Sequence, residues 1–219
     1  LIIWLGSAYG WQEAFIVIGV LGYLWLALFW FTYYTPKDLK ESKLRIVPLK
    51  KLIKTRFVSW FTLSKVFMDP VWYFITFWIG RYLVDVHGWG LEKIGWFVIL
   101  PFVVADFGNI LGGLFTQYII KKGMAVQRAR KVSVSIFGSL MGFSLILGPL
   151  MINSPASALV VLSIAGFGYA AYTSNTMAFP GDVVPQSAIA SVWGIASVGA
   201  GFGGMIFQSL SGITVKHLS

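Results

Sequence analysis

The side chains best suited to chemistry in this sequence are ionisable groups inside long apolar stretches. Lys65 and Asp69 lie four residues apart, so an α-helix places ammonium and carboxylate on one face. Trp72 and Tyr73 continue that face by one turn. A charge near the centre of a bilayer costs about 2.5 to 3.5 kcal/mol. The pattern therefore predicts a cation, an acid and two aromatic rings on one helix face near the middle of a bilayer, where ionisable groups mark candidate functional sites.

Two further apolar stretches carry polar residues. Asp106 and Asn109 share a helical face, and no basic residue within one turn compensates Asp106, which favours a functional role for this acid. Tyr172, Ser174 and Asn175 lie together in the second stretch. Asn175 either bonds a neighbouring helix or binds a polar solute, and both interpretations are open.

Structural explanations also exist for the charged residues. The Lys65 and Asp69 pair could link two helices, or Lys65 could extend its ammonium to the nearby membrane surface. Asp69 and Asp106 could instead form the carboxylate pair of an intramembrane enzyme, which requires them to face one another across helices.

Composition excludes several classes of protein. Of 219 residues, 57% are hydrophobic and 11% are charged, against about 25% charged in a soluble domain. A net charge of +9 on so apolar a chain favours a membrane over a nucleic acid as partner. Zero cysteines exclude a disulfide scaffold and a thiol nucleophile. Because no P-loop, HExxH or Ser-His-Asp set is present, we expect no metal, no cofactor and no enzyme.

The spacing of charges divides the chain into membrane spans, each of which needs about 20 mostly apolar residues. It predicts an all-α polytopic membrane protein in which residues 1–12 are the end of a preceding span and an outer loop. Residues 35–56 are a basic linker, and residues 57–219 form a helical bundle. The six predicted spans lie at 13–34, 57–80, 95–120, 132–152, 156–179 and 188–212.

Basic residues predict the orientation. Loops 35–56 and 121–131 hold thirteen Lys and Arg, whereas the loops on the other side hold three, so the first two are expected to be cytoplasmic. Within the linker, Leu49, Leu52 and Ile53 recur at helical spacing between lysines. This pattern fits a short helix on the membrane interface as well as it fits a solvated linker.

Four segments carry a resemblance to a known family. They are GWQEAFIVIGVLGYLW (10–25), KVFMDPVWYFITFWIGRYL (65–83), ILPFVVADFGNILGG (99–113) and GDVVPQSAIASVWGIASVGAGFGGMIF (181–207). Over nearly its whole length the chain is similar to bacterial hexuronate and aldarate carriers of the anion:cation symporter family, within the major facilitator superfamily. The resemblance implies a half-bundle, spans six to eleven of twelve.

The resemblance also implies a function, namely proton-coupled uptake of a sugar acid (hexuronate, aldarate or aldonate) by alternating access in the inner membrane, driven by the proton gradient. The partners would be a small organic anion, membrane lipids and the missing N-terminal half. Alternatives are a carrier for another anion, a membrane scaffold or an intramembrane carboxylate enzyme. A departure from the superfamily's gating motif is Gln117, which stands where an acid is expected.

The implied substrate contacts come from three helices and include the polar residues described above. They are Lys65, Asp69, Trp72, Tyr73, Asn109, Tyr172, Ser174 and Asn175, with Asp106 and Asp69 as proton-coupling residues.

Overall fold

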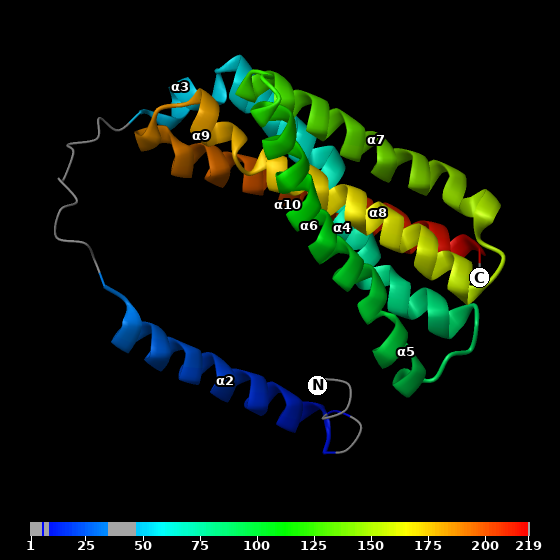
Figure 1. The fold of residues 1–219 in the computed structure, drawn as a ribbon. Helices are drawn as coiled ribbons and strands as arrows, with labels where there is room; N and C mark the ends of the chain where they lie inside the picture. The colour runs from blue at the N-terminus through cyan, green and yellow to red at the C-terminus, as the bar shows by residue number, and fades with distance from the viewer. Residues whose placement is uncertain (1–5, 7–8, 35–46, 219) are drawn as a thin grey trace.

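The computed structural model describes residue 6, residues 9–34 and residues 47–218, and these residues form helices joined by short connections (Figure 1). The main elements are α2 (Trp11–Thr32), α3 (Leu49–Ile53), α4 (Arg56–Asp85), α5 (Leu91–Phe97), α6 (Ile99–Lys121), α7 (Val126–Met151), α8 (Pro155–Thr176), α9 (Phe179–Val183) and α10 (Gln186–Leu218). The described part of the chain holds no strand, which confirms the all-α prediction. Residues 1–5 and 35–46, predicted as a span end and a linker, lie outside it.

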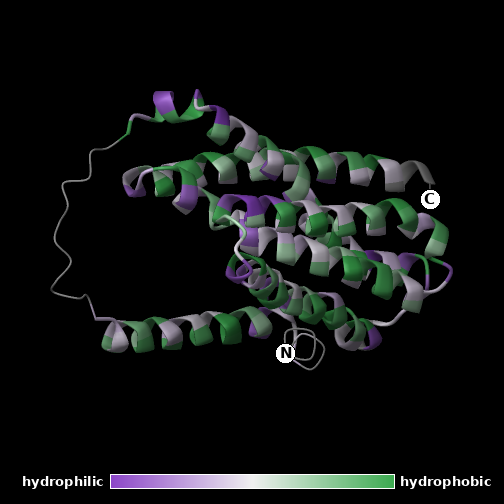
Figure 2. Cartoon of the chain, turned by 45° about the horizontal axis from the view of Figure 1, so that its top comes forward, coloured by the Kyte–Doolittle hydropathy of each residue, from purple (hydrophilic) through white to green (hydrophobic). Residues whose placement is uncertain are grey.

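Each predicted span overlaps a long helix, although α4, α7 and α10 extend beyond the predicted bounds. Five are long and apolar enough to cross a membrane: α2, α7, α8 and α10, and the stretch Lys93–Lys121 that contains α6. Hydrophobic residues predominate along these helices (Figure 2). The remaining predicted span, 57–80, corresponds to α4, which has 30 residues but is less apolar because it carries Lys65, Asp69 and Arg81.

Local sequence explains where the helices begin and end. The predicted break at Asn153-Ser154-Pro155 is present: Ser154 caps α8 by accepting a hydrogen bond from the backbone N–H of Ser157, and Pro155 is the first helical residue. The stretch expected as one span at 95–120 is divided at Val98 into α5 and α6. Pro70 lies inside a continuous α4, so a broken turn at this proline is absent.

Two groups of helices make up the bundle. Helix α8 packs between α6 and α7, while α10 packs along α4, and α2 lies apart from both groups (Figure 1). Both groups depend on glycine. A Cβ atom at Gly112 of α6 would lie 2.6 Å from Ala171 Cα of α8, and one at Gly203 of α10 would collide with the Val66 carbonyl oxygen of α4. Backbones can approach this closely only because these residues lack side chains.

We expect Gly203→Ala to destabilise the contact between α4 and α10. Overpacking costs about 1 to 3 kcal/mol, which corresponds to a fall of about 2 to 12 °C in apparent melting temperature for a domain of this size. Gly201→Ala is the matched control, since nothing lies within 4 Å of a Cβ atom there. Thermal unfolding followed by size-exclusion chromatography measures both, and equal melting temperatures would contradict the packing argument.

The short helix expected in the basic linker is present as α3, which begins directly after Pro48. Leu52 is buried against Val192 and Ala196 of α10. Leu49 and Ile53 are exposed, as are the lysines beside them. The helix is therefore attached to the bundle through one leucine, and its outer side carries both charge and apolar surface.

Candidate functional site

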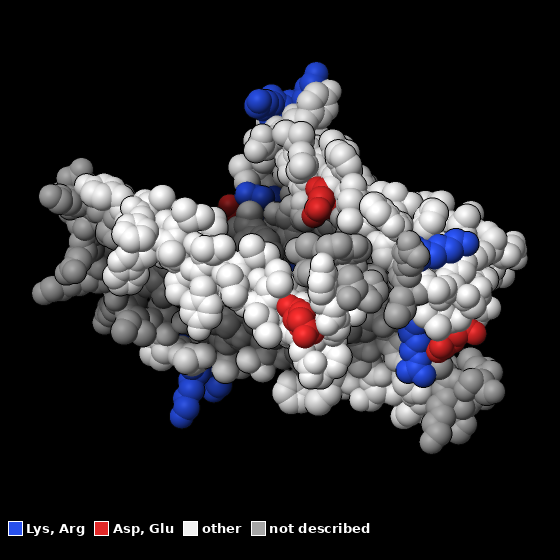
Figure 3. All heavy atoms as spheres, turned by 90° about the horizontal axis from the view of Figure 1, so that it is seen from below, with Lys and Arg blue, Asp and Glu red and all other residues white. Residues whose placement is uncertain are grey.

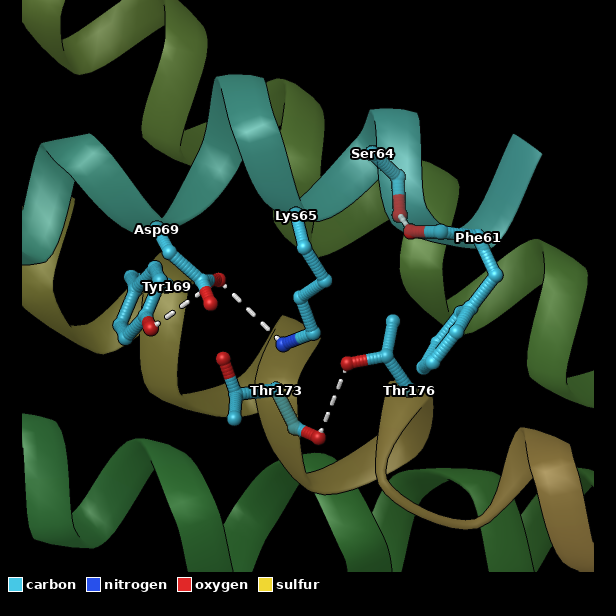
Figure 4. A network of polar contacts seen from close by, with 7 residues as sticks. All are labelled: Phe61, Ser64, Lys65, Asp69, Tyr169, Thr173 and Thr176. Carbon is cyan, nitrogen blue, oxygen red and sulfur yellow. Dashed lines mark hydrogen bonds and ion pairs between the residues drawn. The ribbon is translucent and has the colours of Figure 1, made fainter. Parts of the chain in front are cut away.

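A buried ion pair on α4 faces α8 near the middle of both helices (Figure 4). Lys65 Nζ lies 3.3 Å from Asp69 Oδ1, as the spacing of four residues predicts. The Tyr169 hydroxyl of α8 donates a hydrogen bond to the same oxygen, also at 3.3 Å. The Lys65 side chain is 4% exposed and that of Asp69 14%. The prediction that Lys65 extends its ammonium to the nearby membrane surface is wrong, because the ammonium points at Asp69 within the bundle.

Aromatic rings enclose the lysine. The Lys65 ammonium lies 5.9 Å from the centre of the Tyr172 ring and 5.6 Å from that of Trp193, within the range of cation–π attraction. Trp72 stacks on Tyr169, with ring centres 5.4 Å apart and planes 12° from parallel. The rings stabilise the ammonium away from water without neutralising it, and the Asp69 carboxylate supplies the compensating charge.

Several hydrogen-bonding groups in this cluster are unused. An ammonium has three N–H donors, and in the described structure one of those of Lys65 is bonded, to Asp69. Tyr172 Oη and Thr173 Oγ1 are buried without a hydrogen-bond partner among the described residues. Figure 4 places Thr173 on α8 beside the ion pair. Buried polar atoms are normally paired, so these hydroxyls and the ammonium have hydrogen-bonding capacity for an additional polar group.

The predicted residues Asp106 and Asn109 lie on the exposed side of α6. Neither side chain has a hydrogen bond or an ion pair with another described side chain.

Charged atoms are few on the face shown in Figure 3, as expected for a chain buried in lipid or by a partner. The remaining predicted contacts, Tyr73 on α4 and Ser174 on α8, are half-buried, and the Ser174 hydroxyl donates to the Ala171 carbonyl oxygen at 3.0 Å.

Asn175 is the one predicted contact whose geometry opposes binding of a solute. It is 1% exposed, and both sides of its amide are bonded. Nδ2 donates to the carbonyl oxygens of Gly112 and Ala171, and Oδ1 accepts from Thr116, whose hydroxyl also lies 2.6 Å from Ser133 Oγ. These bonds join α6, α7 and α8, so Asn175 connects helices, which is the alternative that the sequence left open.

We expect Asn175→Ala to lower stability and to leave ligand affinity nearly unchanged. Interhelical hydrogen bonds in membranes average about 0.6 kcal/mol and reach about 1.7, so the melting temperature should fall by a few degrees. The contrasting variant for the melting temperature is Asn109→Ala. Its melting temperature should stay unchanged, because the exposed Asn109 amide stabilises no contact between described helices. A selective loss of affinity in Asn175→Ala, without a change in melting temperature, would restore this residue to the list of substrate contacts.

Sequence reasoning missed three members of the cluster: Tyr169, Thr173 and Trp193. Tyr169 and Thr173 are four residues apart and so share a helical face, which was a usable signal. The signal for Trp193 was absent, because its position beside Lys65 depends on how α10 packs against α4.

The other features of the described chain that could bind a ligand are weaker. No three His, Cys, Asp or Glu side chains of the described residues come together as a metal ligand set. A pocket of about 250 Å³ lies at the far end of α4 and is lined mainly by apolar side chains, among them Ile75, Trp78 and Leu162. At its edge Arg81 pairs with Asp85 at 3.0 Å, so the only charges there neutralise each other.

Long apolar helices around a buried cation and a partly exposed acid define an integral membrane protein with a polar interior. The family model of the Major Facilitator Superfamily matches residues 1–208. The chain therefore belongs to this superfamily, and the predicted fold class and family are confirmed.

Curated relatives narrow the comparison. The chain is 27% identical to a hexuronate transporter of Escherichia coli (strain K12), over 97% of the chain and 53% of the relative. It is 24% identical to a probable galactarate/D-glucarate transporter of the same strain, over 98% of the chain and 54% of the relative. A D-galactonate transporter of Escherichia coli O6:H1 is 25% identical, over 94% of the chain and 53% of the relative. The chain thus spans about half the length of these relatives, all of which are named as transporters and not as enzymes.

Proposed function

We propose that the chain is one half of a secondary transporter that carries a sugar acid across the inner membrane together with protons, by alternating access. The observation that carries this proposal is the environment of Lys65. The residue is 3% exposed, and its ammonium is bonded to a single acid and surrounded by aromatic rings. Charged side chains are rare at this depth, pair with one another, and commonly mark the path of a solute through the membrane.

The surroundings of Lys65 suit a sugar acid better than a simple inorganic anion. One carboxylate of the solute would pair with the ammonium. The stacked pair of Trp72 and Tyr169 offers an aromatic surface for the face of a sugar ring, and the free hydroxyls of Tyr172 and Thr173 match the hydroxyl groups of the solute. The sugar-acid names of the relatives support the same substrate class.

The proposal assigns the protons to Asp69 and Asp106, without any cofactor. It places loops 35–56 and 121–131 in the cytoplasm, because these carry most of the basic residues. The second half of the binding site would come from the half of the carrier that this chain does not contain, since a solute at the midplane is held between two halves.

Uptake into proteoliposomes tests the proposal. The whole carrier should accumulate labelled glucuronate, glucarate or galactonate against a concentration gradient when the outside is made acidic, and a protonophore should abolish the accumulation. Absence of uptake for all three solutes would reject the substrate class. Accumulation that resists the protonophore would reject proton coupling alone.

A further inference from the structure

We propose that Asp69 is a built-in competitor for the carboxylate of the substrate at Lys65, and that the Tyr169 hydroxyl positions it. This inference rests on the proposed function and adds how the bound anion is released. Because Lys65 can form a close ion pair with one carboxylate at a time, the substrate must take the place of Asp69, and Asp69 must take it back.

The geometry of the ion pair is that of a loose bond. Its 3.3 Å separation exceeds the 2.7 to 2.9 Å usual for a charge-assisted hydrogen bond. Lys65 and Tyr169 both bind Oδ1, while Oδ2 has no hydrogen bond among the described residues. Asp69 is thus held by one oxygen, which lowers the cost of its displacement.

Position favours the same exchange. Asp69 is more exposed than Lys65, so a solute entering the site meets the acid first. Once Asp69 moves aside, the ammonium and the unpaired hydroxyls of Tyr172 and Thr173 are donors for the incoming carboxylate. Two rings near the pair, those of Trp193 beside Lys65 and Trp72 beside Tyr169, carry no charge that could substitute for either partner.

Tyr169 controls how well Asp69 competes. Its hydroxyl fixes the Asp69 carboxylate at Lys65, and its ring is fixed in turn by stacking on Trp72. A substrate that binds against the Trp72 ring therefore disturbs the group that holds the competitor in place. The Tyr169 hydroxyl acts through Asp69 and is a positioning group, whereas the Tyr169 ring belongs to the aromatic surface proposed above for the sugar.

The test compares equilibrium binding of galactonate, KM and maximal uptake rate in the whole carrier. Asp69→Asn removes the competing charge with little change in shape. We expect its Kd and KM to fall about 10-fold while the maximal rate falls at least 10-fold, because the anion binds tightly and leaves slowly. Tyr169→Phe keeps the ion pair and loosens it, so Kd and KM should fall about 3-fold.

Two matched controls isolate the effect. Asp85→Asn removes an ion pair of the same spacing from the exposed end of α4, where Arg81 is the partner. Tyr82→Phe removes a hydroxyl that lies 3.2 Å from His87 Nε2, outside the site. Kd, KM and the maximal rate should each remain within about twofold of wild type in both.

A rise in Kd and KM in Asp69→Asn would overturn the inference and make Asp69 a direct substrate contact. A rise in Kd and KM in Tyr169→Phe would likewise overturn the inference and make the Tyr169 hydroxyl a direct substrate contact. If Asp69→Asn fails to fold, as judged by size-exclusion chromatography, the sign of the change in Tyr169→Phe decides. A wild-type carrier that binds no sugar acid would reject the proposed function itself, whereas normal wild-type transport with either contrary variant rejects the competition alone.

Discussion

Lys65→Met is expected to lower the affinity of the whole carrier for sugar acids by about 10- to 150-fold. The variant removes the cation from the middle of α4 and keeps a side chain of similar length. A hydrogen bond to a charged group contributes about 1.5 to 3 kcal/mol, and each 1.4 kcal/mol is a factor of ten in affinity. Asp69 also loses its counter-ion and then repels an incoming carboxylate.

The control for this variant is Lys93→Met. Lys93 also lies over an aromatic ring, 4.4 Å from the centre of Trp89, but it is exposed and far along the chain from the ion pair. Its loss should leave affinity unchanged. Removal of one partner of a buried pair is more destabilising than removal of both, so Lys65→Met/Asp69→Asn should regain stability without regaining affinity. Unchanged affinity in Lys65→Met would mean that Lys65 has a structural role only.

The number and kind of long helices could be predicted from sequence because a membrane imposes simple rules. A span must be long and apolar, and a backbone in lipid must form its hydrogen bonds within the helix. The break at residues 153–155 followed from turn residues alone and is present as the cap of α8. The division at Val98 had a signal that sequence reasoning missed: Pro101 has no N–H to donate to the preceding turn, and it lies in the first turn of α6.

The candidate site was predicted where its geometry is local and missed where it is not. Lys65 and Asp69 meet because four residues complete about one helical turn. Asn175 was grouped with Tyr172 by spacing, yet its amide is bonded to α6 and Tyr172 faces Lys65 of α4. Helix α8 has neighbours on several sides, so residues one turn apart can serve different contacts. Only the packing of helices decides which.

The second large effect is expected at Asp106, which is exposed on α6 and has no side-chain partner among the described residues. Asp106→Asn should reduce uphill accumulation of a sugar acid driven by a proton gradient by at least 10-fold. An amide cannot carry a proton across the membrane, so the coupling is lost. Exchange of labelled for unlabelled solute, which needs no net movement of protons, should persist within about threefold of wild type.

Comparison of accumulation with exchange separates this role from a role in binding. Asp85→Asn is the matched control, because it removes a carboxylate from the exposed end of α4, outside the site. It should retain uphill accumulation. If Asp106→Asn loses exchange as well as accumulation, Asp106 contributes to binding or structure. If it retains both, the proton must pass through Asp69 or through the other half of the carrier, because Asp106 is the only other acid near the middle of a described span.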